Sequence, residues 1–356
     1  MAYTDIDDPS AYFQTALFTG NAGTNAITNT GNSDLQPDWV WFKCRSAAEH
    51  HGLFDSVRGV TKVVYSNLST AQDNLADSLA SFNSDGFTMG ADTGSSGAFN
   101  GNSKTMVAWQ WKAGTSFTND ASGTGIGTID STGSVNTDAG FSIISYTGNG
   151  SAGATVAHGL GAVPKMIIFK RRGSGGWNVY HAGIGNTKSI SLNTDQPTDT
   201  DIAYWNNTTP TSSVFSLGTS AAGNGNGNSM ISYCFAEKQG YSKFGSYTGN
   251  GNADGTFVYT GFKPAWVMVK RSSGTGHWMM LDNKRSASGG FNVLGERLKA
   301  NANDAGATDV YMDFLSNGFK LRNTATSWNA SGSTYIYMAF AENPFVTSTG
   351  VPATAR

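Results

Sequence analysis

The feature that most constrains the fold of this chain is an internal repeat, in which one series of motifs occurs three times in 356 residues. Each copy opens on an aromatic-Thr-Gly-Asn tetrapeptide, continues with a proline and a lysine six residues later, and closes on an aromatic segment. The three copies comprise 18–21, Pro37, Lys43 and 107–111; 146–149, Pro164, Lys170 and 231–235; and 247–250, Pro264, Lys270 and 336–340. A repeat of fixed length in the sequence determines the overall architecture, so it has to be recognised before secondary structure is assigned to single segments. We therefore expect three similar units, and a repeated scaffold favours display or assembly over a single catalytic site.

The repeat divides the chain into ordered parts. We expect a first unit over residues 1–113, a second over 141–240 and a third over 241–345, with a Gly/Ser/Thr-rich linker at 114–140 and a tail at 346–356. Aromatic and β-branched runs such as 39–45 and 165–172 are typical of strands, and the Asn-Gly and Asp-Gly pairs between such runs suit tight turns. The sequence predicts an all-β fold of tandem β-sandwich units, of jelly-roll or lectin-like type.

Helical patterning is scarce. It is best at 69–82, where Leu75 and Leu79 stand four residues apart behind a Ser-Thr start. The equivalent stretch of the third unit, 291–302, has Leu294 and Leu298 at the same spacing. We expect one or two short helices at these places, each lying across a sheet edge.

Composition excludes several classes of protein. Charged residues make up 13% of the chain and the formal net charge is -2, which argues against binding to nucleic acid or to an anionic membrane. The N-terminal residues resemble no signal peptide, and no apolar run approaches the roughly 20 residues that span a bilayer. We expect a product made in the cytoplasm without membrane insertion. Cys44 and Cys234 fall in strands of different units, where buried thiols are expected rather than a disulfide.

One polar constellation recurs. The first and third units align without a gap from Pro37 and Pro264, which places one set of His, Asp and Arg opposite another. The two sets are His50, Asp55 and Arg58, and His277, Asp282 and Arg285, the latter beside Trp278. Two interpretations stay open. One is a site for a polar ligand such as a glycan, and the other, which we favour, is a buried Asp–Arg pair that orders a turn. The same alignment gives Trp177, Ala182 and Gly185 in the second unit, where the charged set is lost.

The tryptophans fall into two groups. Those on predicted strands, such as Trp39 and Trp109, are expected to pack in cores. Those nearer loops are the better candidates for stacking against a ligand, and they are Trp177, Trp205, Trp278 and Trp328.

No catalytic or metal motif is convincing. The chain lacks a Gly-x-Ser-x-Gly elbow, and its acids are few and scattered. His50 and His51 are adjacent, so on a strand they would point to opposite faces, and no His or Cys pair has the spacing of metal ligands. We expect no enzyme activity, no cofactor and no metal.

Several longer motifs resemble an uncharacterised repeat domain of virion proteins from tailed bacteriophages, notably those of marine bacteria and cyanobacteria. The motifs are Gln-Pro-Asp-Trp-Val-Trp-Phe-Lys at 36–43, Leu-Phe-Asp-Ser-Val-Arg-Gly at 53–59, Val-Ala-Trp-Gln-Trp-Lys-Ala-Gly at 107–114 and Asn-Pro-Phe-Val-Thr-Ser-Thr-Gly-Val-Pro at 343–352. The resemblance extends over nearly the whole chain and implies a structural protein on the virion surface. It defines no catalytic residues.

Two functions follow from the resemblance. The first is a tail-fibre or appendage subunit for host attachment, which would bind a host surface glycan or protein. The alternative is a capsid decoration or cement protein, or a tail connector, with no receptor role. In either case the partners are other virion proteins, and a homo-oligomer, by analogy a trimer, is expected. The chain shows no heptads or collagen-like repeats for a fibre shaft.

Overall fold

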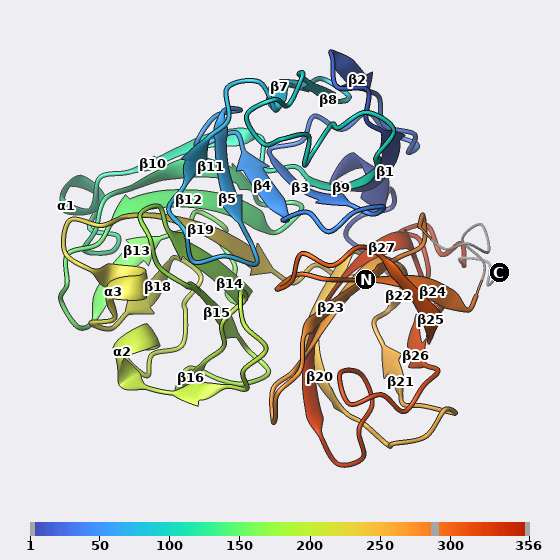
Figure 1. Ribbon diagram of the computed structural model, residues 1–356. Coiled ribbons are helices and arrows are strands. Elements are labelled where there is room, and N and C mark those ends of the chain that lie inside the picture. Colours follow the sequence, from blue (N-terminus) through green and yellow to red (C-terminus); the bar gives the residue numbers. More distant parts are fainter. Residues whose placement is uncertain (1–3, 286–291, 353–356) are drawn as a thin grey trace.

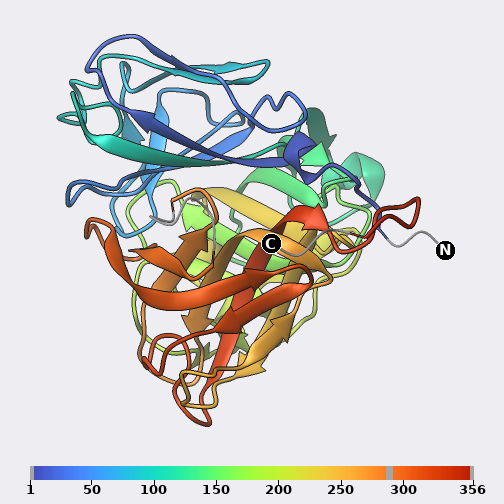
Figure 2. The same ribbon diagram turned by 90° about the vertical axis from the view of Figure 1, so that its right-hand side faces the viewer.

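The computed structural model describes residues 4–285 and 292–352, and antiparallel strands dominate it. The prediction of an all-β fold is thereby confirmed. Figure 1 shows three lobes about a common centre: blue for the first unit, green to yellow for the second and orange to red for the third. Figure 2 shows the first unit lying across the other two.

The main sheet of each unit has the same strand order, in which the last strand of the unit lies beside the first. In the first unit the order is β1 (Phe13–Thr19), β9 (Thr105–Trp111), β3 (Trp39–Cys44), β4 (Gly52–Asp55), β5 (Lys62–Tyr65) and β6 (Asp73–Asn74). In the second it is β12 (Phe141–Thr147), β19 (Ser229–Ala236), β14 (Pro164–Arg171) and β15 (Trp177–His181). In the third it is β20 (Ser242–Thr248), β27 (Thr334–Pro344), β22 (Phe262–Arg271) and β23 (Trp278–Asp282).

The central strands are buried on both faces. In β3, Trp39 and Trp41 point to one core while Val40 and Phe42 point to another. Successive side chains of a strand alternate between faces, and a sheet covered on both sides requires apolar residues at every position. This requirement explains why the strand runs of all three units are continuously hydrophobic.

One of these cores is shared by all three units. It contains Trp39 of the first unit, Phe235 of the second and Trp266 of the third. Phe340 lies at its centre, with its ring 5.2 Å from that of Phe13 and 6.1 Å from that of Phe235. The three units therefore form one body around a common centre, rather than a string of separately packed parts.

The outer face of each main sheet has its own core, covered by further strands. These are β2 (Asn25–Ile27), β7 (Leu79–Asn83) and β8 (Gly86–Met89) in the first unit, and β13 (Ala154–Ala157) and β18 (Val214–Leu217) in the second. In the third unit β24 (Leu294–Lys299), β25 (Ala307–Leu315), β26 (Gly318–Leu321) and β21 (Phe257–Tyr259) continue the main sheet into one of eight strands. This sheet curls round its own core until it is nearly closed.

Two local expectations differ from the structure. Residues 114–140, expected as a linker, supply β10 (Thr115–Asn119) and β11 (Ser131–Asn136), which extend the sheet beyond β12. The helices expected at 69–82 and 291–302 are wrong for the described residues. The first stretch consists of loop and turn with β6 and the start of β7, and β24 lies in the second; residue 291 lies outside the described residues. A spacing of four places Leu294 and Leu298 on one face of a strand as well as of a helix, so the pattern could not separate the two.

The helices that do form are one turn long. They are η1 (Pro9–Ala11), α1 (Ala121–Thr124), α2 (Ile202–Trp205) and α3 (Ala221–Asn224). Among the residues that the structure describes, no helix has the length and apolar character needed to cross a membrane. The described part of the tail folds back, because the Ser348 amide donates to Asp7 Oδ1 at 2.7 Å.

The recurring Thr-Gly-Asn motif closes each unit. The amide of Asn149 donates to Oδ1 of Asn224 at 3.0 Å, and the amide of Asn250 donates to Oδ1 of Asn329 at 2.9 Å. Each accepting asparagine lies just before the last strand of its unit. The glycine of the motif approaches the same loop so closely that a Cβ on Gly20 would lie 2.2 Å from the Gly101 carbonyl oxygen. The motif is repeated because this backbone contact recurs in every unit.

The substitution Gly20→Ala is expected to lower the free energy of unfolding by about 1–3 kcal/mol, because backbone must move to admit the methyl group. Gly23 provides the matched control three residues away, since a Cβ there would meet its nearest atom at 3.7 Å. Gly23→Ala should change stability by no more than about 0.5 kcal/mol. Urea denaturation of both variants checks this, and equal effects would contradict the close contact.

Candidate functional site

The three repeated lysines are fully buried at the ends of β3, β14 and β22. Lys43 Nζ donates to the carbonyl oxygen of Cys44 at 2.8 Å and to that of Asn303, in the third unit, at 3.2 Å. Lys270 Nζ donates in the same way to Arg271, at 2.8 Å, and to Asp195 of the second unit, at 3.3 Å. The repeated lysine is thus a cap for backbone carbonyls, and in two units it joins the unit to its neighbour.

Burial lowers the pKa of each of these lysines to about 8. An unfolded lysine titrates near 10.4. Between these two values the unfolded chain binds more protons than the folded one, so the free energy of unfolding rises with pH. Below pH 8 the lysines are charged in both states and contribute no slope.

We expect stability to increase from pH 8 to about 9.5, by on the order of 1 kcal/mol for each lysine. Above about pH 10 it should fall, because tyrosines ionise in the unfolded chain while burial raises the pKa of Tyr146, Tyr233 and Tyr247 in the folded one. Denaturant melts across this range test the prediction. Lys43→Met should remove about a third of the rise, and a flat or falling profile from pH 8 to 9.5 would contradict it.

The first recurring Asp–Arg set lies inside the protein, at the junction of two units. Arg58 Nε donates to Asp55 Oδ2 at 2.6 Å, and both side chains are fully buried. The hydroxyl of Tyr233, from the second unit, donates to the same oxygen at 2.8 Å. Because every polar atom of Asp55 is used inside the fold, this pair orders a turn and holds two units together.

The second set repeats the arrangement between the third and first units. Arg285 Nε donates to Asp282 Oδ2 at 2.5 Å, again with both side chains fully buried. Trp109 of the first unit donates its Nε1–H to that oxygen at 2.9 Å, and the Arg285 guanidinium lies 5.4 Å from the centre of the Trp109 ring. Asp282 therefore has the same role as Asp55, with an indole in place of a phenol.

Sequence reasoning missed the equivalent residue of the second unit. His181 pairs with Met166 across β15 and β14, as Asp55 pairs with Trp39 across β4 and β3. The match is therefore His181 rather than Ala182, because the second unit is one residue shorter between its lysine and this point. His181 Nε2 lies 3.1 Å from the Tyr337 carbonyl oxygen of the third unit, and burial lowers its pKa to about 4. A polar junction thus occurs in all three units.

The two histidines of the candidate set are only half-buried. Nδ1 of His50 lies 2.7 Å from the Asn67 amide nitrogen, and Nδ1 of His277 lies 3.0 Å from that of Asn301. Burial lowers the pKa of His277, and the nearby Lys299 adds to this. Each histidine thus bonds to an asparagine at a half-buried place, whereas the Asp–Arg pairs are fully buried.

The tryptophans near loops are buried like the rest, and all nine have exposed fractions below 2%. Two of them bond across unit boundaries: Trp177 Nε1 donates to the Tyr65 carbonyl oxygen, and Trp278 Nε1 to that of Ser191, each at 2.8 Å. Trp205 and Trp328 lie in the outer cores. None of the four offers a face to a ligand, which corrects the expectation that loop position implies exposure.

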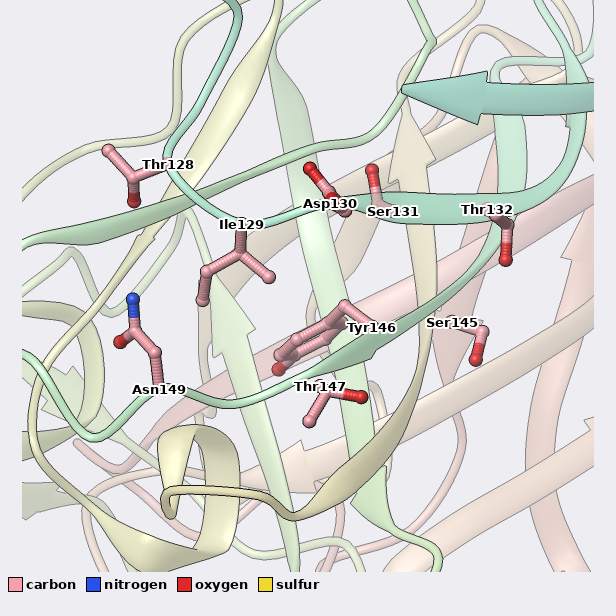
Figure 3. A pocket seen from close by; sticks show the side chains of 9 residues that line it. All are labelled: Thr128, Ile129, Asp130, Ser131, Thr132, Ser145, Tyr146, Thr147 and Asn149. Atoms are coloured by element: carbon pink, nitrogen blue, oxygen red, sulfur yellow. The ribbon is translucent and has the colours of Figure 1, made fainter. Parts of the chain in front are cut away.

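The surface carries several hollows, and one of about 490 Å³ lies on the second unit. Figure 3 shows its side chains along two segments, 128–132 and 145–149. Its buried polar groups are committed to the fold: Tyr146 donates its hydroxyl to the Gly223 carbonyl oxygen at 2.8 Å, and Ser131 donates to that of Ala157 at 3.0 Å. The hydroxyls of Tyr146 and Ser131 are therefore occupied within the fold.

Other chemistry finds little support in the described residues. Within 4–285 and 292–352, no group of three or more His, Cys, Asp or Glu side chains is placed to hold a metal. Cys44 and Cys234 are buried thiols without a disulfide, as expected. Some strongly shifted groups lie at unit junctions, where burial lowers the pKa of His181 to about 4 and that of Lys43 to about 8.

Comparison with known proteins gives one match. A family model described as "Domain of unknown function (DUF7483)" matches residues 8–344, which is most of the 356-residue chain. No curated protein and no solved structure matches the chain.

Proposed function

We propose that this chain, which belongs to the DUF7483 family, is a bacteriophage virion structural protein, exposed on the particle as a tail-fibre or appendage subunit for host attachment. The motif resemblance over nearly the whole chain supports this assignment. The observation that carries it furthest is the use made of the recurring residues. The lysines, the Asp–Arg pairs and the Thr-Gly-Asn motifs bond inside and between units, as a rigid display body requires.

The finer fold that we attach to this proposal is three β-sandwich-like units of lectin or jelly-roll type. Each main sheet packs one face on the shared core, and its other face is covered by strands such as β8, β18 or β26. Two layers around an apolar centre are the usual form of such a unit. Rigid sandwiches that present variable loops suit recognition of a surface.

A connector or cement role is the second candidate, and one surface feature favours it. Strand β21 ends the eight-stranded sheet and exposes two aromatic side chains, Phe257 at 44% and Tyr259 at 59%. An edge strand with exposed aromatics can pair with another protein. In either role the partners are other virion proteins. The homotrimer expected for an appendage would give a molar mass of three chains in light scattering.

A competition assay tests the attachment function. Purified chain, incubated with host cells before infection, should bind the cells saturably and reduce adsorption of the phage that encodes it. Heat-unfolded protein is the control, because it keeps the composition and loses the surface. If native protein binds no host cells and leaves adsorption unchanged, the attachment role fails.

A further inference from the structure

A second surface groove, on the second unit, differs from the hollow described above. Its volume is about 380 Å³, within the range of small-ligand sites. One side is Asn178 on β15 and Ser189 on β16 (Lys188–Ser189). The segment 194–199, which leads into β17 (Asp199–Thr200), and Tyr204 on α2 also line the groove.

Two hydroxyl groups of this groove are buried without a partner. Ser189 is 2% exposed, and its Oγ makes no hydrogen bond within the described structure. Thr194 Oγ1, on the segment 194–199, is likewise a buried atom without a hydrogen bond. A buried hydroxyl without a partner costs about 1–3 kcal/mol, and native proteins rarely keep one without a reason. Both residues line the groove.

A carboxylate and an aromatic ring complete the lining. Asp199 is the cross-strand partner of Ser189, so the two side chains stand on one face of the β16–β17 ribbon. Tyr204 is half-buried, and burial raises the pKa of its phenol, with the carboxylates of Asp199 and Asp201 adding to this. Phenol and carboxylate are therefore near neighbours at the groove.

These polar residues belong to the second unit alone. Three asparagines fix the equivalence of the units here, because each accepts a hydrogen bond from the backbone amide at or just before the start of β4, β15 or β23. They are Asn67, Asn193 and Asn301, which accept from His51, Trp177 and Trp278. Counted from them, Ser189 corresponds to Val63 and Arg297, and Thr194 corresponds to Leu68 and Ala302. At these two positions the second unit therefore has hydroxyl side chains that the other units lack.

We propose that this groove binds a neutral glycan through one or two sugar rings. No lysine or arginine lines it, and the Asp199 carboxylate disfavours an anion. The carboxylate, the amide of Asn178 and the two unpartnered hydroxyls match the dense, uncharged hydroxyls of a sugar, and the Tyr204 ring offers an apolar face for stacking. The inference rests on the proposed attachment function, since it names the class of receptor.

Binding of the full chain to an array of neutral, sialylated and sulfated oligosaccharides tests the proposal, with calorimetry on the best neutral compound. Asp199→Ala should weaken that binding at least tenfold, and Ser189→Ala and Thr194→Val severalfold each. These last two remove unpartnered hydroxyls, so stability should stay unchanged or increase. Asp309→Ala, an exposed acid of the third unit, is the control and should bind like the parent chain. Absence of neutral-glycan binding, or binding that Asp199→Ala leaves intact, overturns the proposal.

The adsorption assay separates this inference from the attachment function. If parent and Asp199→Ala proteins block adsorption equally, attachment stands and the groove is not its receptor site, which overturns the proposal. If the parent binds a neutral glycan in an Asp199-dependent way and blocks no adsorption, the groove is confirmed and attachment fails. If only the parent blocks adsorption and binds the glycan, both are supported.

Discussion

Replacing Asp55 by alanine is expected to lower the free energy of unfolding by about 3–5 kcal/mol. The substitution leaves the Arg58 guanidinium fully buried without its carboxylate, and it removes the acceptor of the Tyr233 hydroxyl from the neighbouring unit. An uncompensated buried charge is far more costly than the loss of an exposed pair. Guanidinium denaturation followed by tryptophan fluorescence measures the change, because the tryptophans lie in the cores.

Two further variants identify the cause. Asp254→Ala breaks the ion pair with Lys320, in which the Asp254 side chain is 78% exposed, and it should cost less than about 1 kcal/mol. The double variant Asp55→Ala/Arg58→Met should be more stable than Asp55→Ala alone, because no charge stays buried without a partner. If Asp55→Ala lowers the free energy of unfolding as little as Asp254→Ala does, the Asp55–Arg58 pair does not hold the junction.

Phe340→Ala is expected to destabilise the whole body by about 3–5 kcal/mol. The ring is buried in the shared core and lies within 5.2–6.1 Å of rings from all three units, among them Phe13, Phe235 and Phe244. A cavity there removes contacts from every unit at once. Denaturation should remain a single transition, with hydrogen exchange of β1, β12 and β20 accelerated together.

The matched control is Phe257→Ala, which truncates the same side chain at a position that is 44% exposed. Its effect should stay within about 0.5 kcal/mol. If Phe340→Ala instead produces separate transitions, or loosens only the third unit, then the units fold independently and the shared core does not couple them.

The sequence was most informative where a position recurs. The spacing of Lys43, Lys170 and Lys270 revealed three equivalent units, and the favoured interpretation of Asp55 and Arg58 as a buried pair agrees with their geometry. The contacts of Lys43 and Lys270 with other units were beyond prediction, because acceptors such as the Asn303 carbonyl oxygen, 260 residues from Lys43, lie far away in the sequence. Contacts between units leave no local pattern.

Predictions from local sequence patterns failed where one pattern is compatible with two different structures. Leu294 and Leu298 suggested a helix, yet both lie on strand β24, because an even spacing places residues on one face of a strand equally well. Trp205 and Trp328 were expected to contact a ligand because they lie near loops, although the fold places both rings in cores. The groove proposed to bind a glycan had no signal in the sequence, since Ser, Thr and Asn are abundant along the whole chain. Only the folded arrangement leaves the Ser189 and Thr194 hydroxyls without a partner.

Cryo-electron microscopy of phage particles from the source of this sequence, with antibody fragments raised against the purified protein, tests the proposed virion assignment most directly. The account predicts a small number of labelled copies on the tail or its appendages, with density for a three-lobed body. Hundreds of copies on the icosahedral lattice of the capsid would contradict host attachment and make the chain a decoration protein. A particle without any label would contradict the virion assignment itself.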